Sequence, residues 1–356
     1  MPPNLRPRKK SKAKNESPLT PQAIGAPNST GFAALPPELL LEIVNHLPRF
    51  PVPCDFLSSP MQCTVYTRQG VLMIMVQLCR SFRSAFVQYL WEEVTLCSLH
   101  GGQRVTSSDP DWTHHSCQLE AGGACTSCEK RLAYEIVAQL ETVTVRVPEY
   151  ATRVQTLSIF IPKYSAKTIV PEFARCLALL PNLKTLQLHL DPHGPLLCQI
   201  IKRVFPKYRY ENIRTLVVPC LEGSMTVIKA CPNARHLHFT STGIFQYLGV
   251  SPSVEKLTGV LPNWFYLRLR IVLPNLKHVQ VRTGRHPPVR SQQWRLVEVL
   301  VQLPKLEVIE IALMRPEAKE EAEAMRKVAD TVLAGMPNIP GTRRRAEICD
   351  YTDEPY

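Results

Sequence analysis

A six-residue pattern of apolar side chains recurs seven times between residues 154 and 311. It reads LKTLQL at Leu183–Leu188 and LKHVQV at Leu276–Val281, and every copy has an apolar residue at its first and fourth positions. The fourth positions are residues 157, 186, 216, 237, 257, 279 and 309, separated by 29, 30, 21, 20, 22 and 30 residues. Short apolar segments at this period predict a repeat architecture, in which neighbouring units share one core.

Most copies follow a helical stretch and a proline. Prolines 181, 206, 232, 252, 274 and 304 lie shortly before six of the seven copies, and apolar segments such as Phe173–Leu180 and Leu196–Phe205 come before two of these prolines. Proline is a common residue just past the end of a helix. We therefore expect units of helix, turn and short strand. Stacked units place the strands in a parallel sheet along the inner wall of an arc and the helices outside it, which is an α/β solenoid.

A separate helix is predicted nearer the N-terminus, at Leu35–Pro48 (LPPELLLEIVNHLP). Pro36 and Pro37 suit its first turn, and Pro48 ends it. The apolar residues at positions 39, 40, 43, 44 and 47 form a broad face at helical period. A short helix with so much apolar surface is not stable alone in water, so it requires a partner in this chain or another.

A second helical segment, Gly70–Leu90, contains the sequence LCRSFRS and leads into LWEEV. Together with the first helix, these motifs resemble an F-box, a small helical module that docks on the Skp adaptor of cullin–RING ubiquitin ligases. The resemblance implies a module over residues 35–97, with an inserted loop at 49–69 where the family usually has a few residues. The adaptor-docking residues that it implies are Leu35, Pro36, Leu39, Leu40, Ile43, Leu47, Leu78 and Cys79.

The repeats in turn resemble the leucine-rich-repeat domain that often follows an F-box in fungal proteins. We expect this domain over residues 129–340, as an irregular solenoid, because the asparagine of strict repeats is missing after most strands. Pro316 is expected to begin a last helix that caps the solenoid. The apolar stripe of that helix consists of Met325, Val328, Val332 and Met336.

A polar strip is predicted along the inner face of the sheet. Successive side chains of a strand point to opposite faces, so Leu186 and Leu188 face the core while Gln187 and His189 are exposed. Solenoids use such inner faces to bind partners, although a solvated strand face is an equally simple interpretation. The candidate target-binding residues are Gln187, His189, His236, His238, His278 and Gln280, and the same alternation also exposes Ser158, Thr258, Arg282 and Glu310.

The remaining segments are polar. Residues 1–34 contain six lysines and arginines against one glutamate. We expect a disordered basic tail there, and a nuclear localisation signal is an equally good interpretation. Residues 98–128 are expected to form an irregular loop, and residues 341–356 a C-terminal tail.

The chain carries a net charge of +12, but outside the tail this charge forms no stripe. A nucleic-acid partner is therefore not expected. The longest uncharged apolar run, Gly70–Cys79, is about half the length that spans a bilayer, so no membrane association is expected. The N-terminus lacks the apolar region of a signal peptide. With twelve cysteines expected to be reduced, this predicts a protein of the cytoplasm, the nucleus or both.

Neither a metal site nor a catalytic site is predicted. His114, His115 and Cys117 lie near the chelating pair Cys125 and Cys128, but structural zinc sites are typically built from two spaced pairs. No phosphate-binding loop, nucleophile elbow, zinc-protease motif or dinucleotide turn is present. We therefore expect a non-catalytic protein without a cofactor.

The order of F-box, helix and repeats predicts a substrate-receptor subunit of an SCF-type cullin–RING ubiquitin ligase. Its F-box would dock on a Skp-type adaptor of the cullin complex, and its repeats would bind an unknown target protein. The alternative is a non-catalytic repeat scaffold for protein–protein interaction without ligase association. In that case the F-box-like helices are a hairpin that caps the first repeats.

Overall fold

The computed structural model describes eleven parts of the chain. They are residues 35–47, 68–96, 126–190, 195–219, 221–240, 251–260, 273–282, 300, 303–313, 319–336 and 344–350.

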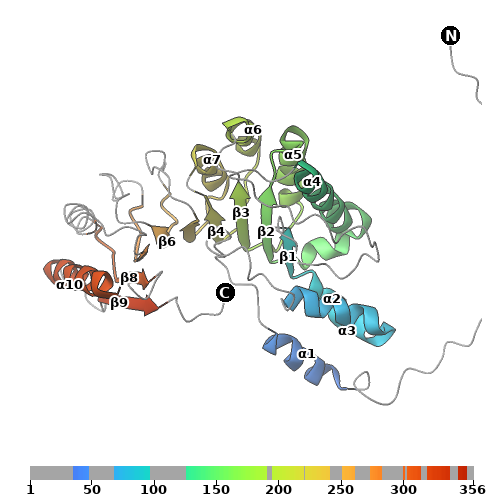
Figure 1. The fold of residues 1–356 in the computed structure, drawn as a ribbon, viewed down its shortest axis with the longest axis horizontal. Helices are drawn as coiled ribbons and strands as arrows, with labels where there is room; N and C mark the ends of the chain where they lie inside the picture. Colours follow the sequence, from blue (N-terminus) through green and yellow to red (C-terminus); the bar gives the residue numbers. More distant parts are fainter. Residues whose placement is uncertain are drawn as a thin grey trace, which may run out of the picture.

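One parallel sheet of nine strands runs through the molecule, and each strand pairs with the next one in chain order (Figure 1). Such an order arises when successive repeats stack on one another. The predicted α/β solenoid with a parallel sheet is confirmed, and all seven predicted strands are present. The strands are β1 (Glu93–Leu96), β2 (Thr156–Ile161), β3 (Thr185–Leu190), β4 (Thr215–Val218), β5 (His236–Phe239), β6 (Lys256–Val260), β7 (His278–Arg282), β8 (Val308–Leu313) and β9 (Arg345–Asp350).

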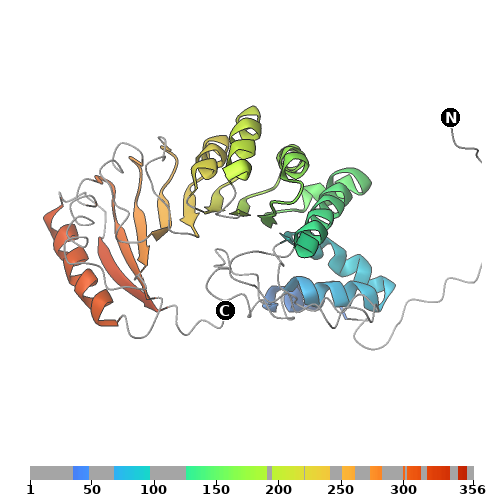
Figure 2. The same cartoon turned by 45° about the horizontal axis from the view of Figure 1, so that its top comes forward.

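The helices of the repeats lie along the outer side of an arc, and the sheet forms its inner wall (Figure 2). Thr142–Arg146 forms a π-helical turn, and Pro148–Thr152 and Phe205–Lys207 form 3-10 turns. Within the described segments, no helix is long and apolar enough to cross a bilayer. The α-helices are α1 (Pro37–His46), α2 (Arg68–Leu78), α3 (Arg80–Leu90), α4 (Thr126–Glu141), α5 (Ala166–Ala178), α6 (Pro195–Val204), α7 (Glu222–Ala230) and α10 (Lys319–Gly335).

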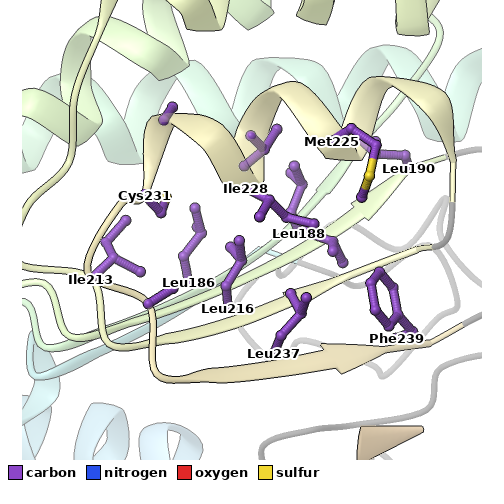
Figure 3. Close-up of a cluster of buried hydrophobic side chains, with 14 of the residues drawn as sticks. Leu186, Leu188, Leu190, Ile213, Leu216, Met225, Ile228, Cys231, Leu237 and Phe239 are labelled. Atoms are coloured by element: carbon purple, nitrogen blue, oxygen red, sulfur yellow. The ribbon is translucent and has the colours of Figure 1, made fainter. Parts of the chain in front are cut away.

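The repeat core consists of apolar rows that cross the strands. Leu186, Leu216 and Leu237 lie in register on β3, β4 and β5, and all three are fully buried. Figure 3 shows Met225 and Ile228 of α7 facing this row. Burying a leucine side chain contributes about 1.5–3 kcal/mol, so repetition of the row from strand to strand stabilises the whole arc.

An asparagine ladder holds neighbouring repeats together at the turns before the strands. The side-chain amides of Asn182, Asn212 and Asn233 donate to the backbone carbonyls of Thr152, Pro181 and Glu211, at 2.6, 2.7 and 2.9 Å. Asn275 donates in the same way to Pro252, at 2.7 Å. Asparagine was expected only after the strands, so this position before the strands was not predicted from the sequence.

Both ends of the sheet extend beyond the predicted solenoid. At the N-terminal end, β1 pairs with β2, so the sheet begins before residue 129. At the C-terminal end, the prediction of a tail from residue 341 is wrong, because Arg345–Asp350 forms β9 beside β8. Ala346 and Ile348 of β9 pack against the repeat core. A strand forms here because the open edge of β8 offers unpaired backbone groups.

The C-terminal helix α10 covers this end of the repeat core. Met325, Val332 and Met336 are buried, as predicted, while Val328 is half-buried. The structure describes this helix over Lys319–Gly335, and the expected start at Pro316 lies outside the described residues.

The three N-terminal helices have a core of their own. Leu40 and Val44 of α1 pack with residues of α2 and α3, in a cluster separate from the repeat core. The expectation of a single helix over Gly70–Leu90 is wrong, because the helix is interrupted at Cys79. That residue is extended (φ −157°, ψ 169°), and its thiol accepts a hydrogen bond from the backbone N–H of Phe82.

Candidate functional site

Two parts of the structure are candidates for binding, and the first is the outer surface of α1 and α2. On α1, Leu40 and Val44 face the three-helix core. Leu39 and Leu41 remain 50% and 41% exposed. Three consecutive leucines point in different directions around a helix, so the core takes one of them and solvent contacts the other two.

Helix α2 is apolar around most of its circumference. Leu72 and Val76 are buried inward, whereas Ile74 and Leu78 are 60% and 65% exposed. A helix that is apolar on every side normally lies inside a protein. We call the four exposed side chains the apolar surface of α1 and α2; they are Leu39, Leu41, Ile74 and Leu78.

The structure separates the predicted adaptor-docking residues into three groups. Pro36, Leu39 and Leu78 are exposed, as docking requires, whereas Leu40 is buried and is not available to a partner. Leu41 and Ile74 were missed, because helical period alone does not show which sides of an all-apolar helix are covered. The remaining predicted residues are half-buried, and they are Leu35, Ile43, Leu47 and Cys79. All of them except Ile43 pack against the three-helix core.

The second candidate is the polar strip on the inner face of the sheet. Its expected exposure is wrong for most of its members, while His236 and His278 are half-buried. Strands about 4.8 Å apart bring these side chains against one another, where they hydrogen-bond to their neighbours instead of to water. The fully buried members are Ser158, Gln187, His189, His238, Thr258, Gln280 and Glu310.

A directed chain of hydrogen bonds runs across β5, β6 and β7. The Arg282 guanidinium lies 3.0 Å from Nε2 of His238. Arginine only donates, so this nitrogen accepts, and the proton of His238 is on Nδ1. Nδ1 then donates to Oγ1 of Thr258 at 2.6 Å. The Thr258 hydroxyl is left to donate to Nε2 of His236, 2.9 Å away. Arg282 therefore sets the tautomer of both rings.

A second group of bonds centres on Glu310 of β8. One carboxylate oxygen accepts from Nε2 of His278 at 2.8 Å, and the other accepts from the side-chain amide of Gln280 at 2.6 Å. The amide oxygen of Gln280 accepts from the backbone N–H of Gly259 at 3.3 Å. Glu310 is thus a buried acid held by donors from a neighbouring strand.

Burial keeps His189, His236 and His238 of the strip neutral. It lowers the pKa of His189 to about 3 and that of His236 to about 4. The pKa of His238 is held well below its usual value, first by burial and then by the charge of Arg282. His189 also lies 2.6 Å from the side-chain amide of Gln187. Most of the predicted target-binding residues are therefore buried and hydrogen-bonded, and His189, His236 and His238 are uncharged.

No group of three or more histidine, cysteine or acidic side chains suited to a metal ion occurs within the described parts of the chain. His114, His115, Cys117 and Cys125 lie outside the described residues. Cys128 lies in α4, but its side chain is not described. The expectation that these cysteines hold no zinc therefore remains a prediction from the sequence.

Comparison with known proteins gives no family. No protein-family model matches the chain, and no curated protein matches it. Among solved structures, a crystal structure of a structural-genomics target from Bacteroides fragilis is similar at 11% identity. That match covers 61% of this chain and 71% of the other, with a TM-score of 0.26.

Proposed function

We propose that this protein is the substrate-receptor subunit of an SCF-type cullin–RING ubiquitin ligase. Helices α1 to α3 dock on a Skp-type adaptor, and the repeat domain holds a target protein. One observation carries the proposal. The three helices already have a complete core of their own, yet they leave Leu39, Leu41, Ile74 and Leu78 exposed.

These four exposed side chains can contribute binding free energy when a partner covers them. Covering the exposed half of one leucine or isoleucine contributes about 1 kcal/mol. Each of these side chains that a partner covers adds about this amount, and apolar contacts at the centre of an interface dominate its affinity. Ile74 and Leu78 are four residues apart on α2, so they lie on the same side of that helix and one partner can cover both.

The rival interpretation makes the helices a cap of the repeat scaffold. It requires the Leu35 face of α1 to pack against the first repeats. Instead, Leu35, Leu40 and Val44 belong to the cluster formed with α2 and α3. Among the described residues, only Trp91 packs against both cores, and its ring stacks on Tyr150 at a centroid distance of 5.2 Å. This arrangement favours a separate docking module that is attached firmly to the repeats.

In this function the chain contributes proximity rather than chemistry. A target bound to the repeats is held at a high effective concentration near the ubiquitin-loaded enzyme, which another subunit carries.

Binding to a purified Skp-type adaptor tests the proposal. We expect the full chain to co-purify with the adaptor, and the variant Leu39→Asp/Leu78→Asp to bind at least about tenfold more weakly, since it places charges in an apolar interface. The control variant is Leu179→Asp/Leu196→Asp, which changes leucines that are 44% and 52% exposed in the repeats. It should bind as the parent does.

Two results would contradict the proposal. One is that the parent chain does not bind the adaptor, and this would favour the scaffold. The other is that both double variants bind equally well although their thermal unfolding matches that of the parent.

A further inference from the structure

Three cationic residues lie side by side at the start of consecutive strands. Lys184, Arg214 and Arg235 immediately precede β3, β4 and β5. The backbone N–H of Arg214 donates to the carbonyl of Lys184 at 2.7 Å, and that of Arg235 donates to the carbonyl of Arg214 at 2.8 Å. Neighbouring strands are about 4.8 Å apart. We call these three exposed residues the cationic row.

The same position in the following repeats has a different charge pattern. Glu255, Lys277 and Glu307 continue the line before β6, β7 and β8, so the sign alternates there. Lys277 and Glu255 form an ion pair at 3.6 Å. Alternating charges in adjacent strands stabilise one another, whereas like charges side by side repel. The repeats of β3, β4 and β5 therefore differ in charge pattern from the repeats that follow them.

The cationic row lacks acidic partners within the described parts of the chain. No ion pair involves Lys184, Arg214 or Arg235 there, and the nearby Glu211 is paired with Arg209 at 3.1 Å. The Arg214 guanidinium donates to the backbone carbonyl of Asn233 at 3.3 Å. This bond holds the guanidinium in place without neutralising its charge.

We propose that the cationic row binds an acidic, carboxylate-rich segment of a partner protein, laid across the starts of β3, β4 and β5. Two of the three residues are arginines, whose planar group binds carboxylates through two parallel hydrogen bonds. The row spans only about 10 Å. Nucleic-acid surfaces with strong affinity contact many more phosphates than three cations provide, so a short acidic peptide fits better.

This proposal specifies the chemical class of the target in the proposed function. It rests on that function only in treating the partner as a target of the ligase. The cationic row lies in the repeat domain and includes no residue of α1 or α2, so its test uses no adaptor. Failure of one proposal therefore leaves the other standing.

The test measures binding of a fluorescent polyglutamate peptide to the full chain by anisotropy. We expect Lys184→Glu/Arg214→Glu/Arg235→Glu to bind at least about tenfold more weakly than the parent, because three favourable charge contacts become repulsive. The control makes the same change in net charge at exposed residues of the outer helices, on α5, α6 and α7. It is Lys167→Glu/Arg203→Glu/Lys229→Glu, and it should bind within about twofold of the parent.

Three results would overturn the proposal. The parent chain does not bind the peptide, or both triple variants lose affinity equally, which indicates attraction by net charge alone. In the third, an oligonucleotide binds the parent chain more tightly than the peptide does, and only Lys184→Glu/Arg214→Glu/Arg235→Glu abolishes this binding. That result would assign the surface to nucleic acid. Unchanged thermal unfolding of both variants shows that they are folded.

Discussion

The guanidinium of Arg68 donates to the carboxylate of Glu92 at 2.9 Å, which joins the first residue of α2 to the residue before β1. The Arg68 side chain is 4% exposed and that of Glu92 24%. The backbone carbonyl of Glu92 also accepts from the N–H groups of Gln155 and Thr156, at 2.9 and 3.0 Å. Glu92 therefore connects the three-helix module to the first two strands and sets their relative orientation.

Breaking this pair should destabilise the chain. Removal of one partner from a buried ion pair costs about 3–5 kcal/mol, and partial exposure of Glu92 reduces this. We expect Glu92→Ala to lower the free energy of unfolding by about 2 kcal/mol, because the Arg68 charge is left buried without its partner. Arg326→Ala, which breaks an exposed pair with Glu323 on α10, should cost less than about 0.5 kcal/mol. Urea unfolding measures both values, and equal effects would show that the Arg68 contact does not join the two parts.

Gly259 in β6 should not tolerate a side chain. Its φ of +77° is unfavourable for other residues, and an added Cβ would lie 2.1 Å from the backbone oxygen of Phe239. We expect Gly259→Ala to lower the free energy of unfolding by at least about 2 kcal/mol. In contrast, a Cβ at Gly335 would meet no atom within 4 Å, so Gly335→Ala should be neutral or slightly stabilising. Denaturant unfolding compares the two, and similar values would contradict the tight packing around β6.

Because burial keeps His189 and His236 neutral, we expect the free energy of unfolding to decrease in mild acid. In the folded chain the pKa is about 3 for His189 and about 4 for His236, whereas both are near 6.5 when unfolded. As the pH falls below about 6.5, the unfolded chain therefore takes up protons that the folded chain does not. Stability is complete above this pH and declines towards about pH 4, by up to about 1.4 kcal/mol per pH unit for each histidine.

Carboxylates also titrate in this range, so a variant isolates the contribution of one ring. His189→Gln should show a shallower decline between about pH 6.5 and 4, by up to one proton, in urea unfolding curves. His46→Gln is the control, because this histidine is exposed on α1. If the slope of His189→Gln equals that of the parent, His189 is not held neutral by burial.

The repeat period predicted the strands well because it depends on a local rule. Apolar residues such as Leu186, Leu216 and Leu237 recur on one face of each strand, and every unit needs its neighbour to bury them. In the N-terminal part, the break at Cys79 was missed, since both sides of it have helical character. Leu41 and Ile74 were missed because a helix with apolar residues on every side gives no indication of which side is covered.

The polar strip shows a different limit. The alternation of side chains along each strand correctly predicted that Gln187, His238 and Gln280 lie on the face opposite the leucines. The face of the sheet on which a side chain lies does not determine whether it is exposed to solvent. Whether a polar side chain contacts water or its neighbour depends on the neighbour's identity and register across strands that are far apart in sequence. Arg282 and His238, for example, are separated by 44 residues.

The sequence by itself determined the repeat period, the strand positions and the separation of an N-terminal helical segment from the repeats, because these follow from the spacing of apolar side chains along one chain. Tertiary structure decided which leucines of α1 and α2 remain exposed, and it turned the inner strip into a hydrogen-bonded network. It also brought Lys184, Arg214 and Arg235 together in one row. Each of these depends on contacts between residues distant in sequence, whose pairing is set only when the sheet assembles.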